Sequence, residues 1–318
     1  QADRAMYDAK RTGSGVTLYE PAMEANGTSQ VGLLGELRRA IPEGELRLHF
    51  QPKISVRSGD VVGLETLIRW QHPQRGILTP AAFLPVAEAS GLVRAVSAWV
   101  MPTALEQLNR WMSQGLDVSV AVNVSAQDLA DDGFPAQVGR WLDESGVPAN
   151  QLVVELTEAS AISDTERGTG ALAGLRALGA RVSLDDFGSG YSSLAYLAQL
   201  PLDEVKLDRA FLTSSLDADG FMLRSVVEIG HHLGLSVVAE GVETVETYRR
   251  LASFGCDSVQ GYVCAQPMPA ERVAGFVARW QPDEWATAGG QAATVSAVGG
   301  TRAVRRSAAV HRQGARRG

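Results

Sequence analysis

The sequence is poor in cysteine and contains no long apolar run. Only Cys256 and Cys264 occur among its 318 residues, which excludes a disulfide framework and a cysteine-based zinc site. No apolar stretch reaches the roughly 18 residues that a membrane-spanning helix requires, and no charged-then-apolar signal segment opens the chain. We therefore expect a cytoplasmic protein with no membrane segment in this chain, or the cytoplasmic part of a longer sensor protein.

Acidic residues are absent after Trp285, where six arginines stand among small residues. Removing these six charges from the net charge of -7 leaves -13 for the rest of the chain. Such an acidic body repels a phosphate backbone, which argues against broad nucleic-acid binding, and it suits a site that concentrates cations. The segment after Trp285 has too little apolar surface to offset its chain entropy, so we expect it to be disordered.

Composition divides the chain into three regions. Residues 1–28 hold a short helical pattern from Ala2 to Lys10, and Gly27-Thr28-Ser29 is expected to separate that pattern from the middle region. Residues 29–282 alternate apolar runs of four to eight residues with longer helical patterns. Residues 283–318 form the Ala-, Gly- and Arg-rich tail.

The middle region is predicted to contain eight strands separated mostly by helices. Only Gly59-Asp60 joins the first two strands, which should pair as a hairpin, and the later strand–helix alternation is typical of parallel pairing. The pattern therefore predicts an α/β barrel with one reversed strand. The expected strands are Leu46–Gln51, Val61–Ile68, Val118–Asn123, Leu152–Leu156, Arg181–Leu184, Glu204–Leu207, Ser236–Ala239 and Ser258–Tyr262. A helical stripe runs from Trp99 to Trp111, and Pro102 inside it should kink or interrupt the helix.

A polar side chain stands at the end of most of these apolar runs. Asp185-Asp186 is the clearest case, because two carboxylates precede a glycine-bearing loop. In a barrel the carboxyl ends of parallel strands share one face, where active sites are built. The other strand-end residues are Glu65, Asn123, Glu155, Lys206, Glu240 and Gln260.

The strand-end acids favour a metal site. Magnesium and manganese prefer hard oxygen ligands, and so many carboxylates would repel one another without cations. Two divalent ions would offset this repulsion, with Asp185 placed to bridge them. A pair of metals is a standard means of phosphoester cleavage. Lys206 is suited to orient a water or neutralise a phosphate, and Arg69 to clamp a phosphate.

Plainer interpretations apply to single residues. An isolated strand-end acid is most often a helix cap or a solvated turn residue, although six in strand order are not all caps. Asp208, Ser125 and Thr244 are expected to be caps. His72 beside Pro73 is expected to be structural.

The segment Glu65-Thr-Leu-Ile-Arg-Trp70 resembles the signature of EAL domains, the cyclic di-GMP phosphodiesterases of bacterial second-messenger signalling. The resemblance covers roughly residues 30 to 281 and is specific because its fragments occur together and in order. The other fragments are Phe50-Gln-Pro52, Pro80-Ala-Ala-Phe-Leu-Pro-Val-Ala-Glu88, Asn123-Val-Ser125, Glu155-Leu-Thr-Glu158, Asp185-Asp-Phe-Gly-Ser-Gly-Tyr-Ser-Ser193, Lys206-Leu-Asp208, Ala239-Glu-Gly-Val-Glu243 and Gln260-Gly-Tyr262.

The resemblance implies a modified TIM (β/α)8 barrel with one antiparallel strand that hydrolyses cyclic di-GMP to linear pGpG with two Mg2+ or Mn2+ ions. One metal would be held by Glu65, Asn123, Glu155 and Asp185, and the other by Asp185, Asp186 and Glu240. Glu65, Lys206 and Glu240 would be catalytic, with Lys206 positioning the water.

The same resemblance assigns substrate and coupling roles. The substrate would be contacted or supported by Gln51, Arg69, Gln260 and, less directly, Glu243. Glu158 would steady the loop that includes Phe187, Gly188, Ser189 and Gly190, which in this family couples the site to the dimer interface. A homodimer through the barrel is therefore expected.

Two departures from the family pattern stand out. Thr66 replaces the middle alanine of the naming motif, and strand alternation points it away from Glu65, so the chemistry should survive. Val263-Cys-Ala-Gln266 replaces the usual aromatic and glycine after Tyr262, which affects guanine-side packing and substrate affinity rather than the metal site.

The first residues also resemble a known domain. Ala2-Asp-Arg-Ala-Met-Tyr-Asp-Ala-Lys-Arg-Thr-Gly13 is similar to the last helix of a GGDEF diguanylate cyclase domain, but the Gly-Gly-Asp-Glu-Phe motif is absent. We interpret residues 1–28 as the remnant of such a domain and a linker, the alternative being an ordinary amphipathic helix.

Two other functions remain open on sequence grounds. The first is a catalytically silent module that binds cyclic di-GMP or a partner protein. The second is another metal-dependent barrel that acts on a different phosphodiester.

Overall fold

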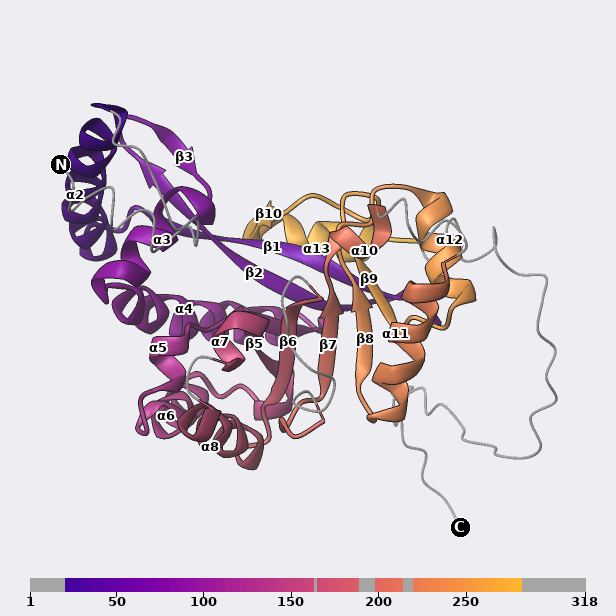
Figure 1. Cartoon of the computed structure of the whole chain (residues 1–318). Coiled ribbons are helices and arrows are strands. Elements are labelled where there is room, and N and C mark those ends of the chain that lie inside the picture. The colour runs from indigo at the N-terminus through magenta and orange to yellow at the C-terminus, as the bar shows by residue number, and fades with distance from the viewer. Residues whose placement is uncertain (1–20, 163–164, 189–197, 214–219, 282–318) are drawn as a thin grey trace, which may run out of the picture.

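The computed structural model describes residues 21–162, 165–188, 198–213 and 220–281 (Figure 1). Ten strands form one sheet in the order β10-β1-β9-β8-β7-β6-β5-β4-β2-β3, and an additional β1–β2 pairing closes eight of them into a barrel. The strands are β1 (Leu46–Ser55), β2 (Val61–His72), β3 (Gly76–Leu78), β4 (Ser119–Asn123), β5 (Leu152–Thr157), β6 (Arg181–Phe187), β7 (Glu204–Leu207), β8 (Ser236–Ala239), β9 (Ser258–Gln260) and β10 (Met268–Pro269).

Strand β1 is the reversed strand of the barrel. It pairs antiparallel with β2 on one side and with β9 on the other, whereas the remaining barrel pairs are parallel. The predicted hairpin, the eight barrel strands and the single reversal are therefore confirmed. The hairpin is longer than predicted, and its far end joins β3 beside α2 and α3, outside the barrel (Figure 1).

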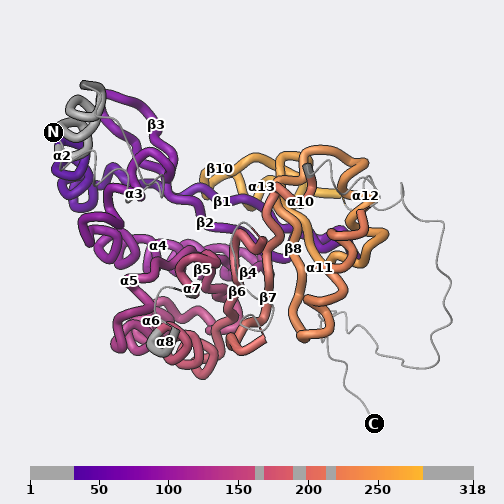
Figure 2. The backbone as a smooth tube through the Cα atoms, in the orientation of Figure 1, coloured from indigo at the N-terminus to yellow at the C-terminus, as the bar shows by residue number. Residues whose placement is uncertain are grey.

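Helices surround the barrel wall, as the tube in Figure 2 also shows. They are α2 (Pro21–Glu43), α3 (Pro80–Ser90), α4 (Val93–Ser113), α5 (Ala126–Leu129), α6 (Phe134–Ser145), the 3-10 turn η1 (Ala149–Gln151), α7 (Glu158–Ile162), α8 (Thr165–Ala177), α10 (Arg209–Thr213), α11 (Phe221–His232), α12 (Val245–Ser253) and α13 (Ala270–Arg279).

Two predicted interruptions of helices are not found. Helix α2 passes through Gly27-Thr28-Ser29, where a break was expected. Glycine, threonine and serine each lower helix propensity by about 1 kcal/mol or less, so a longer helix tolerates them. Helix α4 likewise continues through Pro102, because burial of its apolar face, which includes Leu105 and Leu108, outweighs the lost backbone hydrogen bond.

The apolar core lies between the barrel wall and the helices. Alternate strand residues such as Val120, Val154 and Val205 point outward into this layer and are buried. The residues between them point into the lumen, because successive strand side chains face opposite sides. Buried polar residues accumulate on that lumen face: Gln51, Lys53, Glu65, Ser119, Glu155, Ser183, Glu204, Lys206, Ser258 and Gln260.

Among the described residues, no helix combines the length and the apolar character needed to cross a bilayer. The proposed GGDEF remnant from Ala2 to Gly13 and the tail from residue 283 lie outside the described residues.

Candidate active site

The strand-end residues predicted from the sequence meet at the carboxyl ends of the parallel strands. Glu65 comes from β2, Asn123 from β4, Glu155 from β5 and Asp185 from β6. Glu240 directly follows β8. We call these five residues, with Lys206 of β7, the upper layer of the lumen.

Lys206 is the cation at the centre of this layer. Its side chain is only 1% exposed, and four carboxylates surround the ammonium group. The Nζ atom lies 2.6 Å from Glu240 Oε1, 3.1 Å from Glu155 Oε2, 3.3 Å from Asp185 Oδ1 and 3.5 Å from Glu65 Oε2. One positive charge therefore faces four acidic groups, and the layer is acidic even after pairing.

Amide side chains fix the orientation of Glu65. Asn123 Nδ2 donates to Glu65 Oε1 at 3.2 Å and reaches Glu155 Oε2 at 3.5 Å. Gln260 Nε2 donates to Glu65 Oε2 and, at 3.2 Å, to Gln51 Oε1. Gln51 Nε2 in turn donates to the Ala265 carbonyl at 3.1 Å. The amides thus hold the carboxylate on two sides.

The acids form two groups that could each hold a metal ion. Ligand atoms of Glu65, Glu155 and Asp185 all lie within 4.8 Å of one another, as do those of Asp185, Asp186 and Glu240. Asp185 belongs to both groups. Hard oxygen donors in this density are the ligands that Mg2+ and Mn2+ prefer.

The pKa values in the layer reflect an excess of carboxylates over its one lysine. Burial raises the pKa of Glu155 well above its ordinary value despite the opposing charge of Lys206. Burial raises the pKa of Glu240 to about 8, again against Lys206. Burial lowers the pKa of Lys206, but the surrounding carboxylates outweigh it and hold that pKa well above its usual range. These pKa shifts favour a charged Lys206 and protonated Glu155 and Glu240 until further cations bind.

The turn after β6 is held by specific contacts. Asp186 has a left-handed backbone with φ of 56°, a conformation that aspartate adopts more readily than most residues. Gly188 has φ of +91° and lies so close to Phe211 that a Cβ atom would stand 2.1 Å from its ring. Glu158 Oε2 accepts a hydrogen bond from Gly188 N at 3.0 Å, which is a contact of the kind expected for a residue that steadies this loop. Ser189 and Gly190 lie outside the described residues.

A cavity of about 260 Å3 opens above the acids. Its lining adds residues that the sequence predictions missed, chiefly Arg209 and Leu67. Arg209 Nη1 pairs with Glu243 Oε1 at 2.9 Å, so Glu243 is at the rim of the cavity rather than among the ligand atoms. The position of Arg209, directly after Lys206-Leu-Asp208, was the signal that could have identified it. The lining residues are Gln51, Glu65, Leu67, Asp185, Arg209, Glu240, Gly241, Glu243, Gln260, Gly261 and Tyr262.

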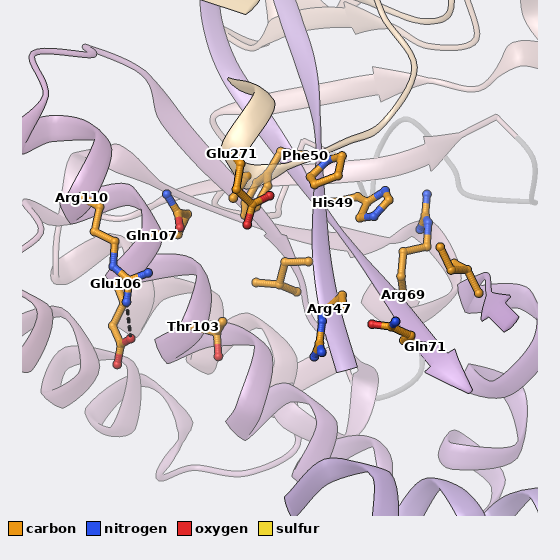
Figure 3. A pocket seen from close by; sticks show the side chains of 14 residues that line it. Arg47, His49, Phe50, Arg69, Gln71, Thr103, Glu106, Gln107, Arg110 and Glu271 are labelled. Atoms are coloured by element: carbon orange, nitrogen blue, oxygen red, sulfur yellow. Dashed lines mark ion pairs between the residues drawn. The ribbon is translucent and has the colours of Figure 1, made fainter. Parts of the chain in front are cut away.

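Arg69 is not among the residues that line this cavity. It lies on the lumen-side face of β2, further along the hairpin, and lines a second cavity of about 410 Å3 between β1, α4 and the start of α13. In Figure 3 Arg69 lies beside His49 and Gln71, apart from Glu106 and Arg110 of α4. Its charge still interacts with Tyr262 and Glu65, which line the first cavity.

A second charged layer lies below the upper layer in the lumen. Lys53 Nζ contacts both oxygens of Glu204 at 2.8 Å and 2.7 Å, and Ser183 Oγ donates to Glu204 Oε1 at 3.1 Å. Ser183 and Glu204 precede Asp185 and Lys206 by two residues on the same strands. We call Lys53, Ser183 and Glu204 the lower layer.

The plainer interpretations are also confirmed. Ser125 and Thr244 cap helices α5 and α12 through their side chains, and Asp208 Oδ1 accepts from Ala210 N at 2.7 Å. His72 is buried and its Nε2 lies 3.1 Å from Glu36 Oε2, which is a structural contact.

The departures from the family pattern lie where expected. Thr66 is 3% exposed and belongs to the outward face of β2, and its hydroxyl is buried without a hydrogen-bond partner among the described residues. Cys264 packs against the apolar core. Tyr262 is 61% exposed at the cavity rim.

Comparison with known proteins places this geometry in a family context. The family model described as EAL domain matches residues 34–267. The chain is 41% identical over 281 residues to the bifunctional diguanylate cyclase/cyclic di-GMP phosphodiesterase MucR of Pseudomonas aeruginosa, covering 87% of this chain and 41% of MucR. It is 38% identical over 272 residues to the cyclic di-GMP phosphodiesterase PdeR of Escherichia coli, covering 85% of this chain and 41% of PdeR. The chain thus spans less than half the length of these relatives.

Solved structures show the same architecture. The PaMucR phosphodiesterase in complex with c-di-GMP superimposes with a TM-score of 0.72 at 40% identity, covering 76% of this chain and 99% of that one. The FimX EAL domain from Pseudomonas aeruginosa bound to c-di-GMP gives a TM-score of 0.69 at 25% identity, covering 74% of this chain and 96% of that one.

Proposed function

Because this chain belongs to the EAL domain family, we propose that it is a metal-dependent phosphodiesterase that hydrolyses cyclic di-GMP to linear pGpG. The observation that carries the proposal is the upper layer, in which four carboxylates converge on one buried lysine. The proposed substrate is inferred from relatives named cyclic di-GMP phosphodiesterases and from a solved phosphodiesterase structure in complex with c-di-GMP.

The donor set suits two Mg2+ or Mn2+ ions. Glu65, Asn123, Glu155 and Asp185 would hold one ion, and Asp185, Asp186 and Glu240 the other. When bound, the ions would lower the pKa of a water and stabilise negative charge on the phosphate. The charge surplus around Lys206 supports the assignment, since divalent cations would replace the protons that the raised pKa values of Glu155 and Glu240 indicate.

The chain's own residues would orient the reaction. Lys206, charged and fixed by four carboxylates, is suited to donate hydrogen bonds to the attacking water and hold it in line with the phosphorus. Gln260 and Gln51 would support the substrate from β9 and β1, and they keep Glu65 in place. Arg69 and Glu243 would act from further out, with Arg209 at the cavity rim as an additional cation for a phosphate.

We also propose that the chain works as a cytoplasmic homodimer. The proposal comes from the resemblance of the loop after Asp186 to the family loop that couples the site to the dimer interface, and the Glu158–Gly188 hydrogen bond ties the start of that loop to α7. A change in that turn would alter the backbone that carries two of the acids. Analytical ultracentrifugation with and without the substrate would measure the oligomeric state.

The decisive experiment incubates purified protein with cyclic di-GMP and either Mg2+ or Mn2+ and follows pGpG by chromatography. Turnover in metal and none in chelator is expected, and Glu65→Ala should abolish turnover without unfolding the protein. Binding of cyclic di-GMP in chelator with no hydrolysis in either metal would instead identify a silent binding module. Hydrolysis of other cyclic dinucleotides in preference to cyclic di-GMP would replace the proposed substrate.

A further inference from the structure

The lower layer contains a charged pair that the proposed chemistry does not use. Lys53 and Glu204 are joined by 2.7–2.8 Å contacts, and their side chains are 7% and 9% exposed. The pair joins β1 to β7, two strands that are separated in the sheet by β9 and β8. Lys53 therefore reaches Glu204 across the lumen rather than along the wall.

The lumen is shaped to let Lys53 make this crossing. Gly63 pairs with Lys53 in the β1–β2 hairpin, and a Cβ atom at Gly63 would stand 3.2 Å from Lys53 Cε and 2.9 Å from Ser119 Oγ. Any larger residue would thus crowd the lysine stem. On the far side, Ser183 donates a further hydrogen bond to Glu204.

Glu204 is also a potential partner for Lys206. The two residues stand two positions apart on β7 and both point into the lumen, which places their Cα atoms roughly 7 Å apart. Their charges already interact, since Lys206 helps to lower the pKa of Glu204, although burial opposes this and Lys53 contributes more. A buried carboxylate without Lys53 would need another cation or a proton, and the flexible stem of Lys206 makes it the nearest cation.

We propose that Lys53 is a positioning residue that occupies Glu204 and thereby keeps the Lys206 ammonium among the upper-layer acids. The predicted change in kcat rests on the proposed phosphodiesterase function. The predicted change in metal affinity does not, because the position of Lys206 also sets the charge that a metal ion meets in the upper layer.

The test compares wild type with Lys53→Met and with the double variant Lys53→Met/Glu204→Leu. In Lys53→Met the Lys206 ammonium should move down to Glu204. The kcat per folded molecule should then fall by about 10- to 100-fold, somewhat less than the roughly 10²–10³-fold loss seen when a transition-state contact is removed outright, with KM little changed. Removing the competing carboxylate in the double variant should restore most of kcat.

Metal binding gives a readout independent of turnover. With Lys206 withdrawn, the upper-layer acids lose the cation at their centre, so Mn2+ titrated into metal-free Lys53→Met should bind several-fold more tightly than to wild type. The double variant should return to the wild-type affinity. A merely structural role for Lys53 would loosen the site and weaken Mn2+ binding by about 10- to 100-fold.

Further outcomes separate the proposals. Lys53→Gln, which can still donate a neutral hydrogen bond to Glu204, should fold more readily than Lys53→Met and show an intermediate effect on kcat and Mn2+ affinity. Unchanged kcat per folded molecule in both single variants, or no recovery in the double variant, would overturn the positioning role. Absence of turnover in the wild-type protein would contradict the phosphodiesterase proposal. The Mn2+ titrations of wild type and the Lys53 variants would still test the position of Lys206.

Discussion

Two lysines lie buried in successive layers of the barrel lumen, and they differ in the number of carboxylates that surround them. Lys53 in the lower layer faces one carboxylate, Glu204, whose remaining hydrogen-bonding capacity is partly met by Ser183. Lys206 in the upper layer faces four carboxylates. The lower layer is balanced by itself, whereas the upper layer has more carboxylates than its one lysine can balance.

The difference also appears in the pKa values. Burial raises the pKa of Glu204, but Lys53, with smaller contributions from Lys206 and Ser183, outweighs burial and holds that pKa below its ordinary value. Burial raises the pKa of Glu155 and Glu240, and the single Lys206 does not compensate. A balanced buried pair contributes to structure, while unbalanced acids at the strand ends form a site for a positively charged ligand.

The largest expected effect comes from removing an upper-layer acid. Asp185→Asn should lower kcat by about 10³-fold, because several kcal/mol of charge stabilisation by the metals would be lost. The free energy of unfolding of the metal-free protein should not decrease, since one repelling charge has been removed. Steady-state kinetics and urea unfolding check the two halves, and near-wild-type kcat would contradict the assignment.

Breaking the balanced pair should affect stability instead. Glu204→Gln leaves the Lys53 ammonium buried without a charged partner, and such losses cost about 3–5 kcal/mol in the free energy of unfolding. Urea midpoints of wild type, Glu204→Gln and the exposed control Glu106→Gln should show a large shift only for the first variant. Equal midpoints would show that the Lys53–Glu204 pair does not contribute to the free energy of unfolding.

Metal ions should stabilise the folded protein through the upper layer alone. At a metal concentration 100 times Kd the gain is about 2.7 kcal/mol. Thermal unfolding with Mn2+ and with chelator should show this gain in wild type and in Glu204→Gln, and should show most of it lost in Asp185→Asn. A gain that survives in Asp185→Asn would place the ions elsewhere.

The metal-dependent gain should itself depend on pH. The raised pKa of Glu240, about 8, means that this group contributes stability below its unfolded pKa near 4.5 that is lost as pH rises toward 8 in the metal-free protein. Mn2+ competes with those protons, so its stabilisation should be larger at pH 8.5 than at pH 6. Glu204 behaves oppositely, since its lowered pKa contributes stability that is lost as pH falls below about 4.5.

The smallest expected effect lies outside both layers. Thr66→Val removes a buried hydroxyl that has no hydrogen-bond partner among the described residues and keeps the volume, so it should raise the free energy of unfolding by about 1 kcal/mol. Since Thr66 points away from Glu65, kcat should stay as in wild type. A fall in kcat would show that the position affects the site.

Much of the site could be predicted because strand ends carry their own signal. Each of the acids, and Asn123, follows an apolar run, and parallel strands bring such ends to one face. Arg209 was missed because a single arginine after a strand looks like a helix-start residue. The position of Arg69 by the second cavity was not predictable, since the hairpin extends beyond the barrel by an amount that only the pairing of β1, β2 and β3 defines.

The helix errors have a similar origin. Local rules place a break at Gly27-Thr28-Ser29 and at Pro102, yet α2 and α4 continue. For α4 the apolar contacts that outweigh the local cost come from residues distant in the chain, which no window of sequence contains.

By itself the sequence determined which residues end the strands, the order of strands and helices, and the ligand types available, because these follow from local hydrophobic period and side-chain chemistry. Only the tertiary structure decided that Lys206 would face four acids and that Lys53 would cross the lumen to Glu204, a residue 151 positions away. Barrel closure sets the stagger between strands, and that stagger selects which charges meet at contact distance.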